Sequence, residues 1–489
     1  MDGSGSLPYR SDLLIKEDTI SAIGSFPSQK ADQVINGLGY TLTPGFIDVN
    51  TDSDHLLSLF TYPSQQDFLL QGVTTIIGGH CGASLAPLLY GTLESIRKWT
   101  DTNQINVDWH TVAEFFKTLS GFKIGVNFGT LVGHSTIRRA IINNDLRDLT
   151  TSELEVFEKI VKQSMEEGAL GLSTGLGYVH ARNTPYSEIA RLTKIVARYN
   201  GVYATHLRDE QAGLVAAVNE TIKIAKENKV KTLISHFKPI LGFENQYQTA
   251  LDMLDAANEQ VDIHFDSYPY SSSIVPIYTL LPTWAQNGGL EIMLENIQTS
   301  HIRERILEEL PKLNGESMTI SQAPGAEFLA GKTLGQYAAD YELPIKEALL
   351  QLMSVSKLRA IVFLKNINET LMLKALMRDP ALVASNSASV SDESRIIKHE
   401  RSLRTFPKFL SLAAEKNILP MELAVKKITA TPAAKFNIKN RGLIKQGLKA
   451  DLVLLKNNKP EYVLVNGQLA VKEGKYQGAL AGRIIKRPQ

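Results

Sequence analysis

Two histidines end two short apolar segments of this sequence, Val202–His206 and Thr232–His236, and lie 30 residues apart. The chain between these segments carries apolar residues at the spacing of one helical face, which predicts a strand, a helix and a parallel strand. Both histidines then lie at the carboxyl edge of one sheet, where α/β enzymes place their chemistry. Two imidazoles on neighbouring strands can bind one ion, so the pattern favours a metal site over two structural histidines.

The composition is that of a globular protein whose partner is a small molecule. The 489 residues are 43% hydrophobic and 21% charged, so we expect a sizeable core and no extensive disorder. The 52 lysines and arginines nearly balance the 51 aspartates and glutamates. This balance, without basic clusters, argues against nucleic acid and against a membrane surface as partners. The single cysteine, Cys81, excludes an intrachain disulfide framework. The oligomeric state is left open.

The order of apolar segments predicts an α/β protein with a second, smaller β-domain. Residues 1–43 and 438–489 carry short apolar segments between turn residues, and we expect both chain ends to build one small domain of antiparallel strands. Residues 44–437 alternate strand and helix, which favours a (β/α)8 barrel over an open sheet. The eight strand candidates are Gly45–Thr51, Thr74–Cys81, Ile124–His134, Leu170–Leu176, Val202–Arg208, Thr232–Lys238, Ile263–Tyr270 and Leu382–Ser387.

One interval breaks this alternation. More than a hundred residues separate the seventh and eighth strand candidates, far more than one crossover helix needs. We expect an inserted lid at about residues 274–355.

Ten different short motifs follow one another along nearly the whole chain. They are Pro44–Asp48, Gly72–Thr75, Cys81–Pro87, Leu131–His134, Gly168–Leu176, Tyr203–Glu210, Ile234–Lys238, Tyr268–Tyr270, Arg441–Ile444 and Ala450–Val453. In this order they resemble the D-aminoacylase (N-acyl-D-amino-acid deacylase) family of the amidohydrolase superfamily. The resemblance implies a metal-dependent (β/α)8 TIM-like barrel, a small β-sandwich formed by both chain ends, and a lid inserted late in the barrel.

The resemblance also implies a zinc site. Family members bind zinc through a cysteine after the second strand and histidines after the fifth and sixth, which this sequence matches with Cys81, His206 and His236. One thiolate and two imidazoles leave the fourth position of zinc open, as a catalytic site requires. We expect one zinc per chain. The alternative for Cys81 is a buried structural thiol, since free cysteine is often part of the core.

Two departures from the family pattern affect the same reaction. Where the family has His-x-His after the first strand, this sequence has Asn50-Thr51-Asp52, and Asn386 stands at the position of the catalytic aspartate. An asparagine amide does not titrate and cannot carry a proton. Asn50 is also a poor zinc ligand, whereas Asp52 could still bind the metal or act as a substitute base. Asp54 and Asp392 are the other substitute bases that we consider.

Four further residues fall at or near positions where the family contacts substrate. They are Tyr178, Lys238, Tyr268 and Arg401. A lysine and an arginine would suit a substrate carboxylate. The alternative for each is a solvated charge or ordinary aromatic packing. For Lys238 the spacing adds an argument, because residues two apart on a strand share a face and His236 precedes it by two.

The amino terminus differs as well. The family has another strand before the turn at Asp2–Gly5, where Met1 stands here. Either the small domain lacks that strand, or the start lies upstream and a signal sequence with it. The chain as given contains neither a bilayer-spanning run of about 18 apolar residues nor the apolar core of a signal peptide. We therefore expect a cytoplasmic protein.

These observations lead to two hypotheses about function. The first is a zinc-dependent amidohydrolase of the D-aminoacylase type, which hydrolyses the amide bond of N-acyl-D-amino acids or related D-configured dipeptides. The second is a catalytically impaired pseudoenzyme that keeps the zinc pocket as a ligand-binding or interaction protein. Turnover is what separates the two.

Overall fold

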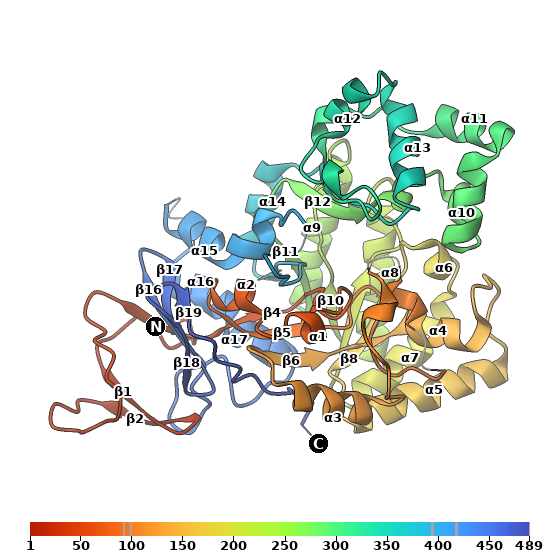
Figure 1. Ribbon diagram of the computed structural model, residues 1–489. Coiled ribbons are helices and arrows are strands. Elements are labelled where there is room, and N and C mark those ends of the chain that lie inside the picture. Colours follow the sequence, from red (N-terminus) through yellow and green to blue (C-terminus); the bar gives the residue numbers. More distant parts are fainter. Residues whose placement is uncertain (91–92, 98–99, 393–395, 416–418, 489) are drawn as a thin grey trace.

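Parallel β-strands with helices between them form the centre of the molecule, so the chain has an α/β fold (Figure 1). The computed structural model describes residues 1–488 apart from 91–92, 98–99, 393–395 and 416–418. One sheet has the order β4-β5-β6 and the other the order β7-β8-β9-β10-β11-β15. The strands are β4 (Phe46–Asp48), β5 (Val73–Gly78), β6 (Asn127–Thr130), β7 (Val132–Gly133), β8 (Gly171–Gly175), β9 (Val202–His206), β10 (Lys231–Ile234), β11 (Ile263–Ser267) and β15 (Ala381–Val383).

The two parallel sheets meet at two places. Leu131 alone separates β6 from β7, so one extended segment belongs to both sheets. At the other side, Thr51 after β4 forms a parallel bridge with Ser387 after β15. The backbone N–H of Asp52 donates to the Ser387 carbonyl at 2.8 Å, which fixes the chain after the first strand against the chain after the last.

The third predicted strand differs from the structure. We expected one strand over Ile124–His134, but the ladder changes partner at Leu131, and His134 is the first residue of helix α4 (His134–Ile142). The His134 ring is buried and its Nε2 contacts the Glu188 carboxylate at 2.7 Å. Its role is therefore structural.

Amphipathic helices cover the parallel strands. The helices between β7 and β11 include α5 (Thr151–Glu166), α7 (Tyr186–Arg198), α8 (Leu214–Asn228) and α9 (Glu244–Asn258). Helix α5 begins with a capping box in which Thr150 and Glu153 satisfy each other's backbone N–H groups. Helix α8 lies between β9 and β10, which pair in parallel, so the predicted strand-helix-strand unit around the two histidines is confirmed.

Both chain ends contribute to one sheet beside the parallel strands. Its order is β19-β18-β17-β16-β3, with Leu452 in β16 paired to Pro44 in β3. The strands are β3 (Thr41–Pro44), β16 (Leu452–Lys456), β17 (Lys459–Val465), β18 (Gln468–Lys472) and β19 (Lys475–Tyr476). A hairpin of β1 (Asp12–Lys16) and β2 (Thr19–Gly24) adjoins it through a bridge between Thr19 and Lys449. Figure 1 shows these red and dark blue segments together on one side of the molecule.

Between β11 and β15 the chain forms a separate layer with its own apolar core (Figure 1, top). An antiparallel sheet of β12 (Ser272–Pro276), β14 (Ile361–Lys365) and β13 (Met318–Gln322) carries α10 (Gly289–Gln298), α11 (Ser300–Glu309), α12 (Leu334–Asp340) and α13 (Ile345–Val355). Because β14 pairs with β12, this layer continues beyond residue 355, where we placed the end of the lid. Among the described residues, no helix combines the length and apolar character that crossing a membrane requires.

Candidate metal centre

Cys81, His206 and His236 converge at the carboxyl ends of three parallel strands. Cys81 follows β5, His206 ends β9, and His236 follows β10. Each residue offers one ligand atom, and these atoms lie within 4.8 Å of one another. The Cys81 Sγ is 3.4 Å from the His236 Nε2, and the two imidazole rings are 4.5 Å apart at an interplanar angle of 80°. The sequence-predicted ligands are thus brought together.

The backbone at this cluster adopts unusual conformations. Cys81 and His236 have φ angles of 53° and 40°, in the left-handed region that residues with a side chain seldom adopt. The turn before Cys81 depends on Gly79, with φ of 77°, because a Cβ there would lie 2.1 Å from the Leu131 carbonyl oxygen. Such strain is retained where the surroundings fix it, and it is frequent at functional sites. It turns both side chains toward the same point.

Glu210 supports this cluster, although the sequence analysis did not single it out. Its Oε1 contacts the His236 Nδ1 at 3.0 Å, and its Oε2 accepts a hydrogen bond from the Lys238 Nζ at 3.0 Å. Burial opposes the charge, but Lys238, His206 and His236 hold the pKa of Glu210 well below its usual range. Its position four residues after His206 was the available signal, since ligand histidines need a carboxylate or carbonyl on the second ring nitrogen.

These donors fit zinc. A thiolate and two imidazoles are the ligand types that zinc prefers, and three of them match a catalytic rather than a closed structural site. The carboxylate of Glu210 leaves the His236 Nε2 facing the Cys81 Sγ, which is the orientation a ligand histidine requires.

The Asn50 amide is held at its nitrogen, whereas its Oδ1 has no hydrogen-bond partner among the described residues. Its Nδ2 donates to both oxygens of Asp266 at 3.3 Å, and the side chain is fully buried. The Asp266 Oδ1 also accepts the backbone N–H of His236 at 2.8 Å, and burial raises the pKa of this carboxyl to about 6. Asn50 therefore serves to bridge β4 to β11 beside the cluster.

Arg401 and Tyr268 form the other wall of the site. Arg401 is only 2% exposed, and its guanidinium carbon lies 4.6 Å above the centre of the Tyr268 ring. Its Nη2 donates to the carbonyl oxygen of Asn386, whereas its Nε and Nη1 have no hydrogen-bond partner among the described residues. A buried guanidinium with two donors that lack a partner among the described residues is costly.

Lys238 and Tyr178 also lie at the cluster. The Lys238 Nζ is 3.5 Å from the His236 Nδ1, but both residues lie beyond the end of β10, so a shared strand face does not account for this proximity. The charge of Lys238 is already paired with Glu210. The Tyr178 ring centre is 4.9 Å from that of His206, and burial raises the pKa of its hydroxyl well above the usual value.

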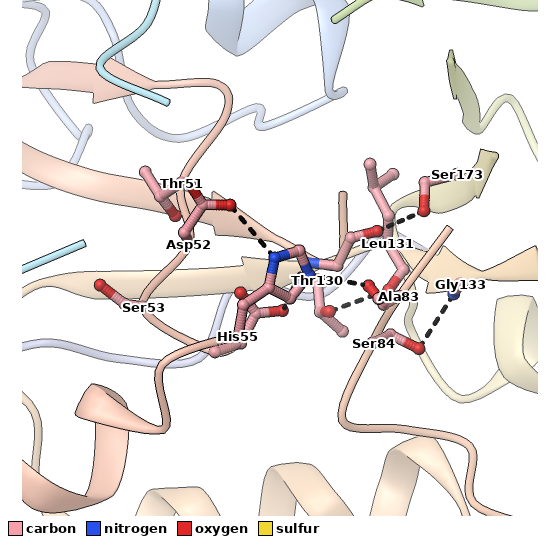
Figure 2. A network of polar contacts seen from close by, with 12 residues as sticks. Thr51, Asp52, Ser53, His55, Ala83, Ser84, Thr130, Leu131, Gly133 and Ser173 are labelled. Carbon is pink, nitrogen blue, oxygen red and sulfur yellow. Dashed lines mark hydrogen bonds and ion pairs between the residues drawn. The ribbon is translucent and has the colours of Figure 1, made fainter. Parts of the chain in front are cut away.

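The three carboxylates considered as substitute bases occupy different places. The Asp52 Oδ1 is 3.1 Å from the His55 Nδ1, and the Asp52 side chain is 16% exposed (Figure 2). Asp54 is fully buried and accepts the backbone N–H of Gly79 at 2.6 Å. Asp392 lies at the surface, where its 82% exposed side chain pairs with Lys398. Only Asp52 combines a buried partner with access to open space.

No family model matches the chain, but full-length relatives are clear. The D-aminoacylase of Alcaligenes xylosoxydans xylosoxydans is 28% identical over 506 residues, which span 100% of this chain and 96% of the relative. The N-acyl-D-aspartate deacylase of the same organism is 27% identical and covers 93% of this chain and 83% of its own. The sequence similarity thus extends over the whole molecule.

Solved structures agree in fold. One of them is a D-aminoacylase with a binuclear metal centre, in which one metal activates and the second attenuates. It is 25% identical, has a TM-score of 0.80, and covers 99% of this chain and 98% of its own. The N-acyl-D-glutamate deacylase of Bordetella bronchiseptica, complexed with zinc and a phosphonate mimic of the tetrahedral intermediate, has a TM-score of 0.83 at 23% identity, over 99% and 97% of the two chains.

Proposed function

We propose that this chain, which belongs with the D-aminoacylase amidohydrolases over its full length, hydrolyses the amide bond of N-acyl-D-amino acids or related D-configured dipeptides. Its partner is then a small molecule with one free carboxylate. Zinc, one ion per chain, is the cofactor that the cluster of Cys81, His206 and His236 would hold.

The observation that carries this proposal is the buried Arg401 beside that cluster. Two of its nitrogens have no partner among the described residues, and Tyr268 fixes the plane of the guanidinium. A planar guanidinium matches a carboxylate in shape and charge. Lys238, though paired with Glu210, adds positive charge on the same side. In an N-acyl amino acid, one carbon separates the carboxylate from the amide nitrogen. A carboxylate held by Arg401 therefore places the amide near the cluster.

Zinc bound there would polarise the amide carbonyl and acidify a water molecule. The chain's own residues do the rest. Glu210 orients His236, Arg401 and Tyr268 hold the substrate carboxylate, and Tyr178 packs against His206 where the acyl group would enter. Asn50 offers a metal only a neutral amide oxygen, which is a poor zinc ligand, and this supports one firm metal site per chain rather than two.

We further propose that the parallel strands close into a (β/α)8 barrel. The shared segment of β6 and β7 and the bridge between Thr51 and Ser387 support closure. On this view residues 1–43 and 438–489 form the small β-sandwich domain, residues 44–437 form the barrel, and the layer between β11 and β15 is the lid.

The test is a turnover assay with zinc-loaded protein on a panel of N-acyl-D-amino acids, with the L enantiomers as matched controls. We expect release of the free D-amino acid, and no comparable release from the L enantiomer. Equal rates on both enantiomers would remove the assigned stereochemistry. No release from any substrate, at full zinc content, would overturn the proposed hydrolase activity.

A further inference from the structure

We propose that Asp52 and His55 form a carboxylate–imidazolium dyad in which His55 positions Asp52 to carry the proton of amide hydrolysis, the task that Asn386 cannot perform. This inference rests on the proposed function, because it supplies the acid–base group which that reaction requires. A positioned acid–base group typically contributes about 10²–10⁴ to a rate. No proton carrier at Asn386 therefore leaves a gap that another group has to fill.

The geometry singles out Asp52. Its backbone N–H donates to the carbonyl of Ser387, the residue after Asn386, so Asp52 lies at the same corner of the site. Asn386 in turn donates its N–H to the carbonyl of Asn50 at 2.9 Å. The carboxylate of Asp52 acts electrostatically on Arg401 and on Tyr178, the residues that border the substrate space. The Asp52 carboxylate, which follows the first parallel strand, can thus take over the proton transfer that Asn386, after the last parallel strand, cannot perform.

His55 is placed to hold that carboxylate and has no access to substrate. The ring is 1% exposed, its Nδ1 faces the Asp52 Oδ1 at 3.1 Å, and its Nε2 donates to the Ala83 carbonyl at 3.2 Å (Figure 2). Both ring nitrogens face oxygen atoms, so beside an ionised Asp52 both must donate, as they do in the doubly protonated imidazolium. His55 is therefore a positioning residue, and Asp52 is the group that reaches the reacting atoms.

The surrounding charges agree with this assignment. Burial opposes a charge on His55, but Asp54, 4.0 Å from its Nε2, and the hydrogen bond to Asp52 raise the pKa of His55 to about 9. Burial likewise opposes a charge on Asp52, but His55 and Arg401 lower its pKa below the usual value. The dyad is thus an ion pair at neutral pH.

Other carboxylates near the site are already occupied. Asp54 is fully buried and bonded to the Gly79 N–H. Asp266 accepts hydrogen bonds from the Asn50 Nδ2 and from the backbone N–H of His236. Both side chains are fully buried, whereas the Asp52 side chain is 16% exposed.

The reaction balances with water as the only co-reactant. As the water oxygen bonds to the amide carbonyl carbon, one of its protons passes to Asp52. Asp52 then delivers this proton to the amide nitrogen while the C–N bond breaks. The second proton of the water stays on the new carboxyl group and passes to the amine when that group ionises. The products are the carboxylate of the acyl group and the ammonium group of the D-amino acid, and Asp52 returns to its ionised form.

The experiment compares Asp52→Asn and His55→Gln with wild type and with Asp392→Asn, which removes an 82% exposed carboxylate that pairs with Lys398. We expect Asp52→Asn to lower kcat about 10²–10⁴-fold at unchanged zinc content, and Asp392→Asn to leave kcat as it is. His55→Gln should lower kcat less than Asp52→Asn does. It should also move the acid limb of the pH profile of kcat to higher pH, because the Asp52 carboxylate loses the cation that keeps it ionised. Adding Asn386→Asp to Asp52→Asn should restore part of the rate.

A measurement on zinc-free protein tests the pair without turnover. In an NMR pH titration, His55 should titrate near pH 9 in wild type and closer to its unperturbed value of about 6.5 in Asp52→Asn. Titration of His55 near 6.5 in wild type would overturn the dyad. So would an unchanged kcat in Asp52→Asn, and in that case the proposed function would stand. A wild type that turns over nothing would instead overturn the proposed function and this inference together.

Discussion

The two halves of the site differ in how they relate to known amidohydrolases. The half after β5, β9 and β10 keeps a thiol and two imidazoles that converge within 4.8 Å. In the half after β4 and β15, amides stand at Asn50 and Asn386 where the family has a histidine and an aspartate, and their contacts are made with the protein itself. The comparison teaches that donors suited to a metal can converge in one half of a site while neutral amides occupy the other half, where our proposal assigns the proton transfer to Asp52 instead.

Breaking the retained half should have the largest effect. Cys81→Ser or His206→Ala removes one of three ligands, so we expect the firmly bound zinc to be lost and turnover to fall below detection. Elemental analysis of protein purified without added metal checks this, with one zinc per chain expected in wild type. His301→Ala, on the exposed side of α11, is the matched control. Two tightly held metals in wild type would contradict the single-site assignment.

The substrate wall comes next in size. Arg401→Met removes two free donors, and hydrogen bonds to charged groups contribute about 1.5–3 kcal/mol, or about 10–150-fold in kcat/KM. We expect the loss mainly in KM, with zinc content unchanged. Arg404→Met, exposed on the same helix α15 (Glu400–Glu415), should leave KM as in wild type. If the two variants behave alike, Arg401 does not contact the substrate.

A smaller effect is expected behind the metal cluster. Glu210→Gln keeps an oxygen for the His236 Nδ1 but removes the charge, so zinc affinity should fall about 10-fold, at the low end for such supporting groups. A chelator competition measures it. Because Lys238 loses its partner in this variant, the thermal unfolding of both proteins is compared first. Zinc affinity equal to that of wild type would show that Glu210 serves Lys238 alone.

The smallest effect concerns stability in the rebuilt half. The pKa of His55 is raised from about 6.5 unfolded to about 9 folded, so its contribution is fully present below pH 6.5 and is lost as pH rises through 9. We expect the free energy of unfolding to fall by on the order of 1–3 kcal/mol across this window relative to His55→Gln. Denaturant unfolding of both proteins at pH 6 and pH 9 gives the difference. Groups that titrate in both proteins, such as Asp48, contribute equally and cancel in the difference. If the free energy of unfolding changes equally with pH in wild type and in His55→Gln, the ion pair is contradicted.

Much of the architecture follows from local sequence. Strand ends and intervening helices could be predicted because apolar periodicity is a local property, and the pairing of β9 with β10 around α8 is an example. The prediction for the third strand was wrong at its carboxyl end. The strand changes partner at Leu131, and this change depends on which neighbouring strand has a free edge. Periodicity does not carry that information.

The site was predictable to a similar extent. Residue types at strand ends were enough to bring His206 and His236 together, and the family resemblance added Cys81. Glu210 was missed because it follows β9 in a loop, and its role depends on which histidine the loop approaches. Lys238 was expected to hold a carboxylate, and its pairing with Glu210 depends on the same loop. The depth of Arg401 also came only from packing, as sequence shows a charge but not its burial.

The pairing of β3 with β16 has a consequence for how the protein is made. Leu42 in β3 lies opposite Leu454 in β16, so the strand directly before β4 stays without this neighbour until the ribosome has added about four hundred more residues. At about 5–20 residues per second this wait is roughly 20–80 s. Throughout that time β3 presents an open edge, and the segment that carries Asn50 and Asp52 follows it directly. Nascent chains of this protein should therefore depend on chaperones until the carboxyl-terminal strands emerge.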